Sequence, residues 1–272
     1  MSARDDLDVG LTTVALRAIL ASSSGSGGRA DVVAHRLGEA IRLGLILDGE
    51  RLPPESRLAE HLGVATVTLR EALEVLRRQH LIRTRRGRGG GTVVTAPADR
   101  AEGLVERLST LTAHDLRDLG DLRSAVLGMA AALAARRAMP PEIARLWQYV
   151  ERLQTAGTPG ERRRADTQFT LGVAAAAQSP RLAKEELRVR SEVGDLLWLE
   201  NDAVDDNDSV AARVHLVEAI EAGDGDEARR QAEELVAADT RRLVQLRLQA
   251  YLAAARRGAV GHETPANPEG PA

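Results

Sequence analysis

Residues 59–94 read AEHLGVATVTLREALEVLRRQHLIRTRRGRGGGTVV and decide the fold of this 272-residue chain. The pattern predicts a short helix, a tight turn, a longer helix, and two short strands joined by an Arg-Gly hairpin. Gly63 lies at the turn, where a residue that tolerates positive φ is needed. Leu69, Leu73 and Leu76 recur at helical spacing and predict a buried stripe. This order of elements is typical of a winged helix-turn-helix.

The other face of the longer helix carries polar and basic side chains suited to DNA, namely Thr66, Thr68, Arg70 and Arg77. The hairpin adds arginines and glycines at Arg86-Gly87-Arg88-Gly89. A helix sized for the major groove beside a flexible hairpin with guanidinium groups makes chemical sense on DNA. An arginine-rich turn met alone is usually only a solvated surface, and a leucine stripe only a core. The order of the pieces favours DNA binding.

Charge separates a basic module from an acidic body. The formal net charge of the chain is −3, yet residues 31–97 hold eleven arginines against eight acidic residues, about +3, which leaves −6 for the remainder. Such a division is typical of a DNA-binding domain joined to a second, different domain. Aromatic residues make up only 2% of the chain, which argues against stacking platforms for RNA or single strands. A single lysine, Lys184, indicates a high-GC bacterial genome.

Composition also predicts the compartment and the domain plan. The absence of cysteine excludes disulfides and favours a cytoplasmic protein, and no apolar run approaches the roughly 18 residues of a membrane span. We expect a mainly α protein in which an antiparallel all-α bundle follows the winged helix-turn-helix, with bundle helices at about 114–137, 141–155, 160–177, 180–204, 208–222 and 224–256. The expected segments are a flexible extension (1–30), the winged helix-turn-helix (31–97), the helical domain (98–257) and a disordered tail (258–272).

Two motifs carry a family resemblance, LPPESRLAEHLGV at residues 52–64 and LREALEVLRRQHLI at residues 69–82. Across residues 31–95 the chain resembles the GntR family of bacterial winged-helix transcription regulators. The resemblance implies that Arg70 reaches the operator from the recognition helix. It also implies that Gly87 and Arg88, at the wing tip, enter or border the minor groove.

The chain departs from the family pattern at two positions. Thr66 stands where the family usually has an arginine just before the recognition helix's Thr/Pro pair. Ser56 stands where it often has another, with Arg57 displaced by one. Threonine cannot make the bidentate guanine contact of arginine, so we expect altered operator preference and a loss of roughly 1–3 kcal/mol of discrimination.

The rest of the chain resembles the all-helical effector domain, FCD, of the FadR-like subgroup. The resemblance covers residues 114–245 and is carried by Asp121-Leu122-Arg123, by Asp166 through Thr170, and by Arg213 through Asp224. Many such domains bind a divalent metal through one Asp and three His. Transferred by position, the Asp is Asp166, and the His positions fall on Thr170, Arg213 and Leu235, none of which is His. We therefore expect no metal and no cofactor.

Arg213 at a metal-ligand position leads to a different hypothesis. Its guanidinium would occupy the space of the cation, pair with Asp166 and present donors to a carboxylate effector. Arg123 and Thr170 are the other candidate effector-binding residues. Asp166 and Arg213 also fit a plain structural pair or a solvated surface, and without knowledge of helix facing both interpretations stay open.

These patterns favour a homodimeric transcription regulator, more a repressor than an activator. Its partners would be a palindromic double-stranded DNA operator and a small-molecule effector, a carboxylate or an acyl ester, with no membrane involved. The alternative is a constitutive DNA-binding factor whose helical domain only dimerises or binds a protein partner. An enzyme is disfavoured, because the sequence has no Glu-x-x-His pair, nucleophile elbow, Walker loop or dinucleotide fingerprint.

Overall fold

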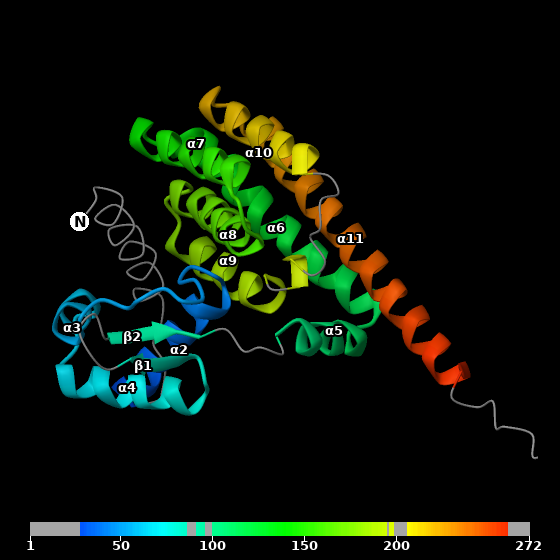
Figure 1. Ribbon diagram of the computed structural model, residues 1–272. Coiled ribbons are helices and arrows are strands. Elements are labelled where there is room, and N and C mark those ends of the chain that lie inside the picture. Colours follow the sequence, from blue (N-terminus) through cyan, green and yellow to red (C-terminus); the bar gives the residue numbers. More distant parts are fainter. Residues whose placement is uncertain (1–27, 86–90, 96–99, 195, 199–205, 261–272) are drawn as a thin grey trace, which may run out of the picture.

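The computed structural model describes residues 28–85, 91–95, 100–194, 196–198 and 206–260. It consists of a small winged-helix domain beside a larger helical domain (Figure 1). The expected N-terminal extension and tail lie outside the described residues, apart from residues 28–30 and 258–260. The mainly α fold class is confirmed.

Among the described residues, the winged-helix domain has three helices and a two-stranded wing. The helices are α2 (Arg29–Arg42), α3 (Glu55–Leu62) and α4 (Thr66–Arg78), and the wing is formed by β1 (Ile82–Arg85) and β2 (Gly91–Val94). Gly63 ends α3 with φ at 63°, the left-handed conformation expected of it. Leu69, Leu73 and Leu76 are buried, as their spacing predicts.

The wing is antiparallel and is joined by a third segment. Ile82 lies opposite Val94, and Arg85 lies opposite Gly91. The loop after α2 runs along the other side of β2, where the Val94 N–H donates to the Glu50 carbonyl at 2.9 Å. The position of β2 therefore depends on this loop.

The helical domain contains seven α-helices and one 3₁₀ turn within the described residues. They are α5 (Arg100–Thr110), α6 (Ala113–Arg137), α7 (Pro140–Thr155), α8 (Pro159–Ala176), α9 (Pro180–Val193), η1 (Leu196–Trp198), α10 (Asp206–Glu221) and α11 (Gly225–Val260). The long helices α6 and α11 pack side by side (Figure 1). α7, α8, α9 and α10 complete a bundle around an Ala- and Leu-rich core.

Prolines mark the helix starts, as the sequence predicts. Pro140, Pro159 and Pro180 each occupy the first turn of a helix, where a missing N–H costs nothing. The prediction of one helix over 180–204 is wrong, because α9 ends at Val193. Gly194 follows it, and Leu196 and Leu197 then turn into a separate apolar cluster with Leu108, Leu116, Val193 and Leu243. Burial of these leucines overrides helix continuation.

The two domains touch through α8 and α9. The Thr167 hydroxyl donates to the Leu43 carbonyl at 3.1 Å, and Arg164 pairs with Glu50 at 3.2 Å. Leu187 of α9 belongs to the same buried cluster as the core of the winged-helix domain. α8 therefore has one face on the winged-helix domain.

Candidate nucleic-acid interface and buried arginine cluster

The N-terminal half of α4 presents its side chains outward. Thr66 and Arg70 are exposed, Thr68 is half-buried, and Arg57 on α3 is exposed. Val67 between the two threonines is 64% exposed. This valine was not among the residues predicted from the sequence, because it has no hydrogen-bond donor in its side chain. Its position between two outward-facing threonines was the signal that could have identified it. An exposed methyl-bearing side chain there can contact the methyl group of thymine.

Arg70 is held by an ion pair across the helix-turn-helix. Its Nε lies 2.8 Å from Glu55 Oε2 at the start of α3, and its side chain remains 66% exposed. The other half of the predicted interface, Arg86, Gly87, Arg88 and Gly89, lies outside the described residues.

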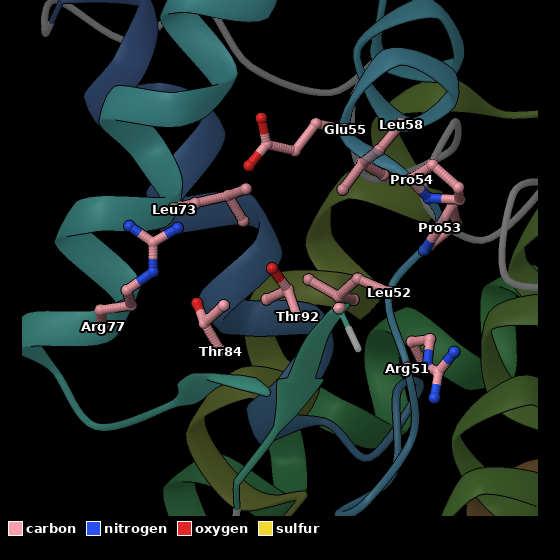
Figure 2. A pocket seen from close by; sticks show the side chains of 11 residues that line it. Arg51, Leu52, Pro53, Pro54, Glu55, Leu58, Leu73, Arg77, Thr84 and Thr92 are labelled. Carbon is pink, nitrogen blue, oxygen red and sulfur yellow. The ribbon is translucent and has the colours of Figure 1, made fainter. Parts of the chain in front are cut away.

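A cavity of about 330 Å³ lies between α3, α4 and the wing (Figure 2). Leu52, Leu58 and Leu73 provide apolar lining, and all three are buried. Thr84 and Thr92, opposite each other in the strand register, line it from the wing.

Arg213 is buried and binds Asp166. Its side chain is 3% exposed, and its Nη2 and Nε lie 2.5 and 3.2 Å from Asp166 Oδ1. Its Nη1 donates to the carbonyl and the hydroxyl of Ser209 at 2.6 and 2.7 Å. The structure thus brings together the pair expected from the sequence and excludes the solvated alternative for it.

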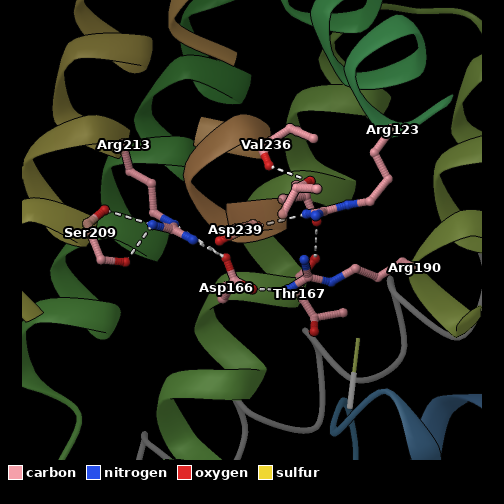
Figure 3. A network of polar contacts seen from close by, with 10 residues as sticks. Arg123, Asp166, Thr167, Arg190, Ser209, Arg213, Val236 and Asp239 are labelled. Atoms are coloured by element: carbon pink, nitrogen blue, oxygen red, sulfur yellow. Dashed lines mark hydrogen bonds and ion pairs between the residues drawn. The ribbon is translucent and has the colours of Figure 1, made fainter. Parts of the chain in front are cut away.

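A second arginine, which the sequence reasoning missed, reaches the same carboxylate. Arg190 of α9 pairs with Asp166 Oδ2 and is 1% exposed. Figure 3 shows Arg213 and Arg190 approaching Asp166 from opposite sides. Arg190 lies four residues after buried Glu186, within the apolar face of α9. The spacing of Glu186 and Arg190, four residues apart among apolar residues of the same helix face, was the sequence signal that could have predicted buried charges here.

Arg123 lies across from this triad. Its Nη2 donates to Asp239 Oδ2 of α11 at 2.7 Å, while its Nη1 is shielded from solvent and meets no acceptor among the described residues. We call Arg123, Asp166, Arg190, Arg213 and Asp239 the arginine cluster. Burial by itself would raise the pKa of Asp239, but the charges of Arg123, Arg213 and Arg190 and the Arg123 hydrogen bond outweigh it and lower that pKa.

Glu186 and Thr170 border the arginine cluster. Burial raises the pKa of Glu186, and the charge of Arg123 and a hydrogen bond with Thr170 oppose that rise only in part. The Thr170 hydroxyl also donates to the Thr167 carbonyl at 3.3 Å. The arginine cluster places three guanidinium groups beside Asp166 and Asp239. This environment suits an additional anion.

The residues at the family's metal positions do not fit a metal ion. Asp166 is occupied by two guanidinium groups, Thr170 is a neutral hydroxyl, and Leu235 is an apolar core residue. Metal ligands in such sites are imidazoles and carboxylates, whereas Arg213 brings a fixed positive charge. Within the described ranges, no three His, Asp or Glu residues are grouped so that they could hold a metal.

The same described ranges contain no helix with the length and apolar character needed to cross a membrane.

Comparisons with known proteins agree with this architecture. The family described as bacterial regulatory proteins, gntR family, matches residues 29–94, and the FCD domain matches residues 118–238. A protein described as an HTH-type transcriptional regulator, RmpR, from Mycobacterium gastri is 40% identical over 196 residues, covering 71% of this chain and 72% of that protein. The Glc operon transcriptional activator of Escherichia coli K12 is 36% identical over 105 residues, or 39% of this chain and 41% of the relative.

The solved structure of E. coli McbR/YncC shares the fold. Its TM-score is 0.50 at 21% identity, and the match covers 80% of this chain and 98% of that one. The two domain matches follow the boundary between the winged helix and the helical bundle. The chain therefore belongs to the GntR family of bacterial regulatory proteins and is a transcription regulator, not an enzyme, with a winged-helix DNA-binding domain followed by an FCD effector domain.

Proposed function

We propose that the protein is a cytoplasmic repressor that binds a palindromic operator as a homodimer and is controlled by a small carboxylate or acyl-type effector. The observation that carries the effector half of this proposal is the buried Asp166–Arg213 pair at positions where related domains bind a metal. A fixed guanidinium can supply the positive charge that a metal would otherwise present to an acidic effector.

The arginine cluster supports an anionic effector in two further ways. Arg190 and Arg213 form planar donor groups around one carboxylate, and a second carboxylate can compete for the same donors. Arg123 Nη1 is a buried donor without an acceptor among the described residues, and such a donor is costly until an acceptor arrives. Arg123, Thr170 and Arg213 are the proposed effector contacts, with Asp166 positioning Arg213.

A palindromic operator requires two copies of the DNA-binding domain related by two-fold symmetry. Leu122 and Met129 on α6 are exposed apolar residues seven positions apart, and so lie on one helix face. They support contact with a second copy through α6. Sedimentation equilibrium tests this assignment, and a monomer at micromolar concentration would contradict it.

A constitutive DNA-binding factor is the second candidate. It is favoured by one observation, namely that Asp166 and Asp239 are already paired with arginines, as in a cluster that only stabilises the fold. A thermal-shift screen with divalent metals, small carboxylates and acyl-CoA esters separates the two candidates. We expect a carboxylate or acyl ester to raise Tm of the wild type and to lose that effect in Arg213→Ala. Arg145→Ala, on the exposed face of α7, is the control.

DNA binding is tested by selecting duplexes from a random pool and measuring their affinity by fluorescence anisotropy. We expect an enriched palindrome and a loss of about 1–3 kcal/mol for Arg70→Ala on that sequence, because a base contact is removed. Arg145→Ala should bind normally. A reporter gene behind the selected operator decides between repression and activation.

A further inference from the structure

The cavity beside the recognition helix lies between the parts of the interface that are expected to read bases. α4 contributes Leu73 and Arg77 to it from beyond its base-reading half, and the wing contributes Thr84 and Thr92. None of these except Arg77 was expected to face DNA. The cavity is part of the winged-helix domain and is separate from the arginine cluster.

The geometry of B-DNA determines which part of the duplex faces the surface between α4 and the wing. With α4 in the major groove and the wing tip at the adjacent minor groove, the surface between helix and wing must meet the phosphate strand that separates those grooves. This step rests on the proposed function, since it takes the placement of α4 and the wing on DNA from it.

The side chains around the cavity suit a phosphodiester. The Nη1 of Arg77 donates to Glu74 Oε2 at 2.6 Å. Its Nε is shielded from solvent and meets no acceptor among the described residues. Thr84 and Thr92 are cross-strand neighbours, so their hydroxyl groups lie on the same side of the wing (Figure 2). Backbone phosphates are bound by arginine and by hydroxyl groups in just this combination.

We infer that this cavity seats the phosphate strand between the major and minor grooves, with Arg77, Thr84 and Thr92 as its donors. Leu52, Leu58 and Leu73 form the apolar floor of the cavity beside these donors. Glu55 also lines the cavity and would repel a phosphate, but its Oε2 pairs with Arg70 Nε at 2.8 Å, which offsets part of that repulsion. These contacts anchor the protein on DNA without reading sequence.

Salt dependence tests this assignment. Anisotropy titrations at several salt concentrations compare the wild type with Arg77→Ala and with the matched control Arg78→Ala, an exposed neighbour on α4 that does not line the cavity. For Arg77→Ala we expect weaker binding to the selected operator and to random duplex alike, and a slope of log K against log salt that is less steep by about 0.9. Arg78→Ala should keep the wild-type slope. Thr92→Val, which keeps the side-chain shape, should lower the affinity for the operator and for random duplex by about the same factor.

Two outcomes would overturn the inference. One is an unchanged slope for Arg77→Ala in a variant whose Tm matches the wild type. The other is stabilisation of the wild type by inorganic phosphate that is lost in Arg77→Ala while its DNA slope is retained, which would make the cavity a site for a small anion. Failure of the proposed function looks different, because the wild type itself would then select no operator.

Discussion

At the scale of single residues, the chemistry of the helical domain centres on one carboxylate between two guanidinium groups. Arg213→Ala removes one partner of buried Asp166 and leaves Arg190 as its ion-pair partner among the described residues. Breaking a buried ion pair strands the other charge, so we expect a loss of about 3 kcal/mol. In a domain of this size that loss lowers Tm by about 6–12 °C. Thermal unfolding measures it.

The matched control is Arg230→Ala on α11. Arg230 likewise forms ion pairs, with Glu227 and Glu234, but at the solvent-exposed surface. Water and salt screen such pairs, so its Tm should stay close to that of the wild type. Equal losses of Tm in the two variants would show that the buried Arg213–Asp166 pair contributes no more to stability than an exposed ion pair does.

Glu186 makes stability depend on pH. Because burial raises its folded-state pKa, the folded protein holds this proton to higher pH than the unfolded chain does. Its contribution to stability is therefore complete below the ordinary glutamate pKa of about 4.3 and is lost as pH rises through the raised value. Glu186→Gln cannot ionise, and its Tm relative to the wild type should increase from pH 4 towards pH 8. Glu185→Gln, on the exposed side of α9 and paired with Arg188, should show no such trend.

At the scale of elements, the turn between α3 and α4 depends on one left-handed residue. Gly63 has φ at 63°, and nothing lies within 4 Å of a Cβ added there, so the cost of a side chain is conformational alone. Gly63→Ala should cost about 1 kcal/mol, and Gly63→Asn less, because asparagine tolerates this conformation. The opposite sign is expected for Gly103→Ala at an exposed position of α5, where nothing lies within 4 Å of an added Cβ and alanine favours the helix by about 0.5–1 kcal/mol. Chemical denaturation measures both changes.

Local signals in the sequence predict most elements but not their pairings. Pro159 and Pro180 begin helices because proline suits a first turn, and Gly63 ends one because glycine suits positive φ. The end of α9 could not be predicted, since it depends on where Leu196 is buried. Arg190 was missed for a related reason. Periodicity shows which residues share a helix face, whereas only packing shows which faces meet.

At the scale of the whole molecule, α8 connects the arginine cluster with the wing. Asp166 faces the cluster, and the next residue, Thr167, binds Leu43 of the winged-helix domain. Arg164, one turn earlier, pairs with Glu50, whose carbonyl accepts from Val94 of β2. An effector that shifts α8 would therefore move Arg164, and through Glu50 it would change a contact that holds β2 of the wing. This contiguous path is a physical basis for proposing that effector binding alters DNA affinity.

The strength of this connection can be measured by unfolding. The double variant Thr167→Val with Arg164→Ala removes the hydrogen bond to Leu43 and the ion pair with Glu50. We expect it to weaken the interaction between the two domains by about 1–2 kcal/mol. Calorimetry of the wild type should show one cooperative transition, because Leu187 lies in the core of the winged-helix domain. In the double variant, we expect the winged-helix domain to melt first, as a separate transition. The control is Thr155→Val with Arg145→Ala on α7, where the threonine hydroxyl donates to the Glu151 carbonyl of its own helix. If both double variants melt like the wild type, the polar contacts of α8 do not couple the two domains.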